Sequence, residues 1–230
     1  MNKMWPRLVR WLLVLMLPFL LSVANFRITN GHWFVRWEYG KVGFPPDDCC
    51  AYSFTIEERT HLAEVCVDYL APGAPISLLA DLRLPNGDAA FNERELSHME
   101  DVQVAFTQIT VIAAVGAVVW IGGFVALAAS RQRRKLAATA LLTGGLFTLG
   151  LLVVIGVVMA VSWWEFFQAF HAIFFQSGTW VFEYSDTLIR LFPIQFWMDV
   201  ATVAVGLLVV EAILVAVVGW VWRRRIKAGI

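Results

Sequence analysis

Four long apolar segments, separated by charged ones, dominate this chain of 230 residues. A bilayer has a hydrocarbon core about 30 Å thick, and about 20 apolar residues in a helix are needed to cross it. Only structures that satisfy their own backbone hydrogen bonds are stable there, which favours helices. With 59% hydrophobic and 16% charged residues, the composition also departs from that of soluble domains. The sequence therefore predicts four membrane-spanning helices, at residues 1–26, 104–129, 136–161 and 196–222.

The first of these segments has two interpretations. A basic start followed by WLLVLMLPFLL and then SVA, just before Asn25, also describes a cleavable signal peptide. A retained helix, however, would leave both chain ends and the basic loop 130–135 on one side of the membrane. We therefore expect this segment to remain as the first spanning helix.

Charges of opposite sign are segregated along the chain, although the formal net charge is zero. Basic residues cluster near the N-terminus, in the loop 130–135 and in the tail 223–230, whereas nearly all acidic residues lie in segments 27–103 and 162–195. Because cytoplasmic loops are enriched in Lys and Arg, we expect the chain ends in the cytoplasm and the two acidic segments outside. All four histidines and all three cysteines lie in those outer segments, so any chemistry is expected on the outer face.

The first outer segment contains patterns typical of strands. ITNGHWFVRWEYG, at residues 28–40, alternates two sets of side chains and is interpreted as a strand. Two more short strands are predicted on either side of the turn formed by Pro85, Asn86 and Gly87.

The same segment also carries helix signals. Thr55 and Glu58 have the spacing of a capping box, and so do Asn92 and Glu95. The second pair predicts that the helix containing His98 starts there and continues into the second span. Together these patterns predict a membrane all-α four-helix bundle with a small extracytoplasmic α+β cap.

The second outer segment, residues 162–195, is rich in aromatic residues, as is typical of membrane interfaces. Its phenylalanines favour an interfacial helix. Ser185 is predicted to cap a short helix that ends at Pro193.

The cysteines permit two interpretations. Cys49 and Cys50 are adjacent and Cys66 follows them, so on the outer face a disulfide from Cys66 to one of the pair would leave an odd thiol. The alternative is a four-helix thiol–disulfide oxidoreductase that passes electrons to quinone. Such a protein would need a C-x-x-C pair and a second pair in the other outer segment, which has no cysteine. The sequence therefore favours structural cysteines over redox chemistry.

Two of the four histidines are candidates for chemistry. His32 and His61 are interpreted as surface or packing residues. His98 lies just before the second span and His171 follows the third by ten residues, and these ends of an antiparallel bundle lie at the same membrane face. Ionisable groups at such a boundary are functional candidates, and a neutral histidine is a ready general base. Asp101, one turn after His98, would orient its ring.

Other uses of two histidines fit the sequence less well. Haem ligands usually lie well inside a bundle, and no zinc-ligand spacing such as H-E-x-x-H is present. No G-x-S-x-G nucleophile motif is present either. Base catalysis on a lipid-borne substrate needs no metal and no protein nucleophile, so we expect neither metal nor cofactor, and no nucleic-acid partner.

Three blocks of the sequence resemble a known family. YSFTIEER (52–59), FNERELSHMEDVQ (91–103) and FHAIFFQSGTWVFEYSDTLIRLFPIQFW (170–197) are similar to the lipoprotein intramolecular transacylases, four-span proteins of the bacterial membrane. The resemblance implies transfer of the sn-2 acyl chain of a lipoprotein's diacylglyceryl group to the α-amine of its N-terminal cysteine, giving a lyso-form lipoprotein. It also implies that His98 and His171 are the two essential histidines. The adjacent Cys49 and Cys50 are not expected from the resemblance, so a lineage-specific variation or a different substrate stays open.

The implied reaction is the aminolysis of an ester. The α-amine, with a pKa of about 7.7–8, is largely protonated at neutral pH. One histidine would remove a proton as the nitrogen attacks, and the other would stabilise the oxyanion or return a proton to the leaving oxygen; which of them is the base stays open. Trp180 and Asp186 are expected to shape the site, although an interface anchor and a helix N-terminal charge describe them equally well.

Rival functions stay open at this point. A non-enzymatic membrane sensor or assembly protein would depend on its outer cap rather than on the histidines. A transporter is disfavoured, since four spans with one buried carboxylate, Glu211, make a thin pathway. Glu211 is expected to hydrogen-bond between helices, and the small residues of LLTGGLFTLG (141–150) favour close helix contact.

Overall fold

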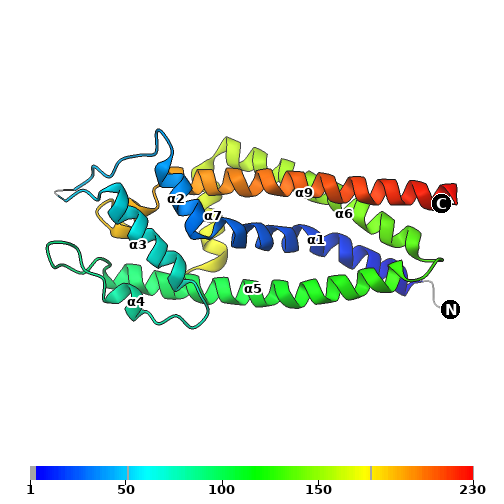
Figure 1. Cartoon of the computed structure of the whole chain (residues 1–230), viewed down its shortest axis with the longest axis horizontal. Helices are drawn as coiled ribbons and strands as arrows, with labels where there is room; N and C mark the ends of the chain where they lie inside the picture. Colours follow the sequence, from blue (N-terminus) through cyan, green and yellow to red (C-terminus); the bar gives the residue numbers. More distant parts are fainter. Residues whose placement is uncertain (1–3, 51, 177, 230) are drawn as a thin grey trace. The chain divides into compact units, whose positions relative to one another are not determined.

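The computed structural model describes residues 4–50, 52–176 and 178–229. The predicted segment 1–26 begins with three residues that lie outside the described residues, and so does Ile230, the last residue of the predicted tail 223–230. Within the described part the chain forms nine helices and no strand. In chain order they are α1 (Trp5–Thr29), α2 (His32–Gly40), α3 (Ile56–Tyr69), α4 (Ser77–Ala80), α5 (Glu93–Ala128), α6 (Arg134–Val161), α7 (Trp163–Phe174), α8 (Thr187–Leu191) and α9 (Ile194–Ala228) (Figure 1).

Four of these helices, α1, α5, α6 and α9, are long and apolar enough to cross a membrane. The four predicted spans are therefore confirmed as helices. All four helices extend beyond the apolar residues that predicted them, because capping and tertiary contacts rather than hydropathy decide where a helix begins and ends. The chain divides into two compact units, the first made of residues 1–26, 110–163 and 203–230 and the second of residues 27–109 and 164–202.

In the first unit the helices approach each other closely at glycines. A Cβ atom on Gly145 of α6 would lie 2.5 Å from the carbonyl oxygen of Ala212 on α9, and one on Gly219 of α9 would lie 2.4 Å from the backbone nitrogen of Leu142 on α6. Small residues allow such backbone contact between membrane helices. The predicted role of the small-residue segment in α6 is confirmed at Gly145.

The half-buried carboxylate of Glu211 on α9 has an interhelical partner. The side-chain amide of Asn25 on α1 donates a hydrogen bond of 2.9 Å to Oε2 of Glu211. The predicted hydrogen bond between helices is confirmed, and it satisfies a group that would be costly to leave unpaired in the membrane.

The second unit is helical, so the predicted α+β cap is wrong in its strands. Residues 32–40, predicted as part of a strand, form α2, whose buried residues are Phe34, Val35, Glu38 and Tyr39. These positions share one face of a helix, and their burial in the unit outweighs the local alternation. Around the turn at residues 85–87 the described chain has a single antiparallel bridge, between Arg83 and Ala89, in place of two strands.

The predicted helix starts are correct at two places and wrong at one. Thr55 caps α3 with the reciprocal Glu58 contact. The backbone nitrogen of Asn92 donates to Glu95, whose own nitrogen donates to the Asn92 side chain at 3.0 Å, so α5 begins there and runs into the second span. The N-cap of α8 is Asp186 and not Ser185.

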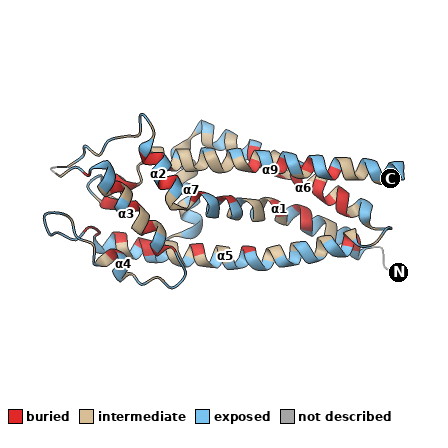
Figure 2. Cartoon of the chain, in the orientation of Figure 1, coloured by how far each residue is buried: buried red, intermediate tan, exposed pale blue. Residues whose placement is uncertain are grey.

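A buried core holds the second unit together. It includes Phe54, Leu62, Tyr69, Leu79 and Leu191. Figure 2 shows buried positions on α2 and α3, which belong to this unit. Burial of each large side chain of this kind stabilises a fold by roughly 1.5–3 kcal/mol.

A charged pair joins two segments of this core. The Arg190 guanidinium donates to both oxygens of Asp47, at 3.1 and 2.7 Å. The Arg190 and Phe54 hydrogen bonds outweigh the effect of burial and hold the pKa of Asp47 below its usual range.

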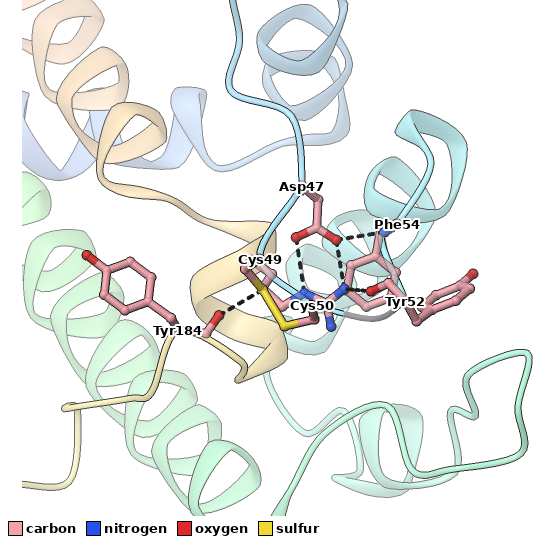
Figure 3. The surroundings of a disulfide bond; sticks show 7 residues. Asp47, Cys49, Cys50, Tyr52, Phe54 and Tyr184 are labelled. Carbon is pink, nitrogen blue, oxygen red and sulfur yellow. Dashed lines mark hydrogen bonds and ion pairs between the residues drawn. A yellow bond between two sulfur atoms is a disulfide. The ribbon is translucent and has the colours of Figure 1, made fainter.

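The cysteines pair differently from the expectation. Cys49 and Cys50 form a disulfide with each other, and Cys49 lies 3.3 Å from the carbonyl oxygen of Tyr184 (Figure 3). Cys66 is a free, buried thiol in the core, where burial raises its pKa. A disulfide to Cys66 is therefore wrong, because that side chain is enclosed among the apolar residues of α3 and its neighbours; the expected odd thiol is present.

Candidate functional site

His98 lies near the start of α5 and is almost fully buried, with 9% of its surface exposed. Its ring packs edge-on against two phenylalanines, with centroid distances of 5.0 Å to Phe175 and 5.3 Å to Phe182. Its Nδ1 atom is buried and has no hydrogen-bond partner among the described residues. A buried polar atom without a partner costs free energy, so His98 is held in place by aromatic packing while part of its hydrogen-bonding capacity is unused.

His171 lies on α7 and is oriented by its own helix. Its Nδ1 donates a hydrogen bond of 2.8 Å to the backbone carbonyl oxygen of Phe167, one turn earlier. A carbonyl can only accept, so in the neutral ring the proton sits on Nδ1 and Nε2 carries a lone pair. Burial lowers the pKa of His171 from its ordinary 6.5, an effect that the Phe167 hydrogen bond offsets only in part. The neutral, proton-accepting form is therefore favoured at pH 7.

The structure brings the two histidines together through a shared phenylalanine. The Phe175 ring lies 5.0 Å from the His98 ring and 5.8 Å from the His171 ring, measured between centroids. Two imidazoles from α5 and from the α7 segment, far apart in sequence, thus contact one side chain.

Trp180 completes the aromatic surroundings of His171. Its indole centroid is 4.8 Å from the His171 ring and 6.3 Å from that of Phe167. The indole Nε1 is buried without a hydrogen-bond acceptor among the described residues. Trp180 thus lies beside His171, and its expected part in shaping the site stays a prediction.

Asp186 connects the segment after Trp180 to the start of α5. It accepts hydrogen bonds from the Asn92 amide at 2.9 Å, from Arg94 at 2.7 Å and from the backbone nitrogen of Glu183 at 2.8 Å. The Arg94 guanidinium also lies over the Phe182 ring, which packs on His98. Asp186 therefore anchors the loop that covers His98 and does not itself contact either histidine ring among the described interactions.

Asp101 is not brought to the site. Its side chain is exposed, and no hydrogen bond joins it to His98 in the described part of the chain. The geometry gives no support for orientation of His98 by Asp101, which stays a prediction. His32, in turn, lies 2.7 Å from Asp68 at the surface, in agreement with a surface role.

Sequence reasoning missed two residues of the site. Phe175 is four residues after His171, and the helical i, i+4 spacing was a usable signal. Phe182 has no such signal, because its contact with His98 depends on the anchoring of the loop by Asp186. Among the described residues no group of three or more His, Cys, Asp or Glu could hold a metal ion.

The arrangement provides a proton acceptor, a second imidazole and a spare indole N–H in apolar surroundings. Such surroundings exclude water and strengthen the electrostatic interactions of any group bound there. The geometry thus suits proton transfer to or from an attacking group and stabilisation of a developing negative charge.

Comparisons with known proteins point to one family. The family model for the lipoprotein intramolecular transacylase Lit matches residues 9–197. An uncharacterized protein of Aquifex aeolicus (strain VF5) is 31% identical over 193 residues, which is 84% of each chain. The solved structure of the lipoprotein intramolecular transacylase Lit from Bacillus cereus shares the fold at a TM-score of 0.76, covering 99% of this chain and 100% of its own at 18% identity. The structure of a variant of that protein, with one histidine replaced by alanine, matches at a TM-score of 0.70. This match covers 98% of this chain and 95% of the variant's chain, at 19% identity.

Proposed function

Since the chain belongs to the lipoprotein intramolecular transacylase (Lit) family of membrane acyltransferases, we propose that it moves the sn-2 acyl chain of a lipoprotein's diacylglyceryl group to the α-amine of that lipoprotein's N-terminal cysteine. The product is a lyso-form lipoprotein. The observation that carries the proposal is the pair of imidazoles, buried His98 and half-buried His171, that contact one phenylalanine ring. Both fall in segments that the family model covers.

His171 acts as the general base in this proposal. Its Nδ1 proton is held by the Phe167 carbonyl, so its Nε2 lone pair is available to the attacking amine. The lowered pKa keeps the ring neutral at pH 7, while the α-amine, with a pKa of about 7.7–8, must lose a proton before or as it attacks. General acid–base help of this kind contributes roughly 10²–10⁴-fold to a rate.

His98 acts on the ester. As a neutral imidazole it carries one N–H, which can donate to the oxyanion or to the leaving sn-2 oxygen. The rings of Phe175 and Phe182 fix its orientation. Holding ester and amine of one molecule together supplies much of the remaining rate through proximity.

The lipid character of the substrate fits the composition of the site. The segment 163–175 supplies aromatic side chains, several of them exposed, such as Phe170 and Phe174, which would contact acyl chains. By the positive-inside rule, we place the site on the outer face of the bacterial cytoplasmic membrane, with both termini in the cytoplasm. Diacylglyceryl lipoproteins and membrane lipid are thus the proposed partners.

The test is tandem mass spectrometry of the N-terminal lipopeptide of a model lipoprotein, produced in a host without other N-acylating enzymes. Transfer within one molecule leaves its mass unchanged, so fragmentation must locate the chain on nitrogen or on glycerol. We expect an N-acyl, lyso-glyceryl product with the wild-type protein and a loss of at least 100-fold with His98→Ala or His171→Ala. His61→Ala, a substitution of an exposed histidine on α3, is the matched control and should leave the product unchanged.

Two outcomes would contradict the proposal. Full activity in the His98→Ala and His171→Ala variants would contradict catalysis by the two histidines. If the lipopeptide keeps both acyl chains on glycerol although the wild-type protein is well expressed, the proposed reaction is contradicted. A binding or assembly function for the second unit would then be favoured.

A further inference from the structure

The indole N–H of Trp180 is a hydrogen-bond donor without an acceptor among the described residues, although the atom is buried. An indole N–H can only donate, and a buried tryptophan usually finds a partner for it. Trp120, which is partly buried, does so in this chain and donates to the carbonyl oxygen of Leu13 at 2.9 Å. The unused donor of Trp180 is therefore a departure that needs an explanation.

The position of this indole supplies one. Its ring centroid lies 4.8 Å from that of His171, the proposed base. The N–H of the His171 ring, at Nδ1, already donates to the Phe167 carbonyl. Of the donors described beside the base, the Trp180 Nε1–H is the one left for a substrate oxygen.

We infer that Trp180 is a catalytic residue whose Nε1–H donates a hydrogen bond to the oxyanion formed on the sn-2 carbonyl, an inference that rests on the proposed function. When the amine nitrogen bonds to the ester carbon, the carbonyl π pair moves onto the oxygen and the amine proton moves to Nε2 of His171. On collapse the bond from carbon to the glycerol oxygen breaks, and that oxygen receives the proton. An amide and a free hydroxyl result, with no other reactant consumed.

This assignment divides the work among three side chains. His171 moves the proton, Trp180 holds the oxyanion, and the single N–H of neutral His98 serves the leaving oxygen. A preorganised donor in an apolar site needs no reorganisation as charge develops. Since an indole N–H does not titrate in the working range, its removal should lower the rate equally at every pH.

The experiment measures initial rates with a synthetic diacylglyceryl lipopeptide and purified full-length protein in lipid nanodiscs. Trp180→Phe keeps an aromatic ring and removes the N–H. We expect kcat to fall about 10²-fold to 10³-fold, with KM and the shape of the pH–rate profile unchanged. Trp33→Phe is the matched control, because Trp33 is exposed on α2, donates its indole N–H to the carbonyl oxygen of Ile28 and contacts no histidine ring among the described contacts; its rate should equal that of the wild type.

A second variant separates loss of the donor from loss of shape. Benzothienylalanine at position 180 keeps the bicyclic ring and replaces N–H by sulfur, so it should show the same fall in kcat even if the phenylalanine variant folds poorly. A rate within about threefold of wild type for this variant would overturn the inference and leave the proposed function standing. Absence of N-acyl product with the wild type would overturn the proposed function itself.

Discussion

At the scale of single residues, the site depends on one backbone contact. The carbonyl of Phe167 selects which nitrogen of His171 holds the proton, and burial of the ring selects the neutral form. His98 has no comparable hydrogen bond at Nδ1 among the described residues and is oriented by Phe175 and Phe182 instead. The two histidines are therefore chemically different, and the difference assigns them different proposed roles.

A pH dependence follows from the His171 assignment. Its pKa is lowered below 6.5, so the base is neutral and active above that pKa and is lost as pH falls through it. The amine, with a pKa of about 7.7–8, is also protonated in acid. We expect the logarithm of the rate to rise with pH with slope two below the pKa of His171 and slope one between the two pKa values.

Initial rates of the lipopeptide reaction between pH 4 and 9 check this expectation. In His171→Ala the pH profile of the residual rate should change slope only once, at the pKa of the amine. A steep acid limb that survives in this variant would assign the proton transfer to another group.

At the scale of helices and segments, the local sequence pattern predicted the wrong element at residues 32–40 and the correct helix starts at α3 and α5. HWFVRWEYG fits both an alternating and a helical period over nine residues, and only the burial of Phe34, Val35, Glu38 and Tyr39 in the unit selects the helix α2. The capping residues of α3 and α5 involve neighbours three positions apart. Such contacts are local, so the sequence predicted them correctly.

The contact between α6 and α9 gives a prediction at this scale. Gly219→Ala would place a methyl group against the backbone of Leu142, where a Cβ atom lies 2.4 Å away. Overpacking of this kind costs about 1–3 kcal/mol, so the thermal unfolding midpoint in detergent should fall. Gly206→Ala, on the same helix with nothing within 4 Å of its Cβ position, should leave the midpoint unchanged or raise it. Equal midpoints for the two variants would contradict this packing.

At the scale of the whole molecule, four apolar helices make this a multi-pass membrane protein. Most basic residues lie near the N-terminus, around the turn between α5 and α6 and at the end of α9, which predicts that both ends of the chain face the cytoplasm. A fluorescent protein that folds only in the cytoplasm, fused after the C-terminus, should fluoresce, and an outer-face reporter at the same position should stay inactive. The opposite pattern would invert the proposed placement of the site.

The sequence alone was enough to predict the membrane class, the four apolar helices and the two candidate histidines. Length and hydropathy decide membrane insertion with little help from the rest of the fold, and the family resemblance rests on short blocks around His98 and His171. These properties are local in sequence, which is why they could be predicted.

The helical form of the cap, the pairing of Cys49 with Cys50 and the surroundings of the histidines could be known only from the folded chain. Each of these depends on which distant side chains enclose a group: burial of the α2 face, enclosure of Cys66 in the core, and the Asp186 hydrogen bonds that hold Phe182 against His98. The buried indole N–H of Trp180 belongs to the same class. Whether a donor lacks an acceptor depends on which groups the fold places around it. For this physical reason the sequence could name Trp180 but not the role proposed for it.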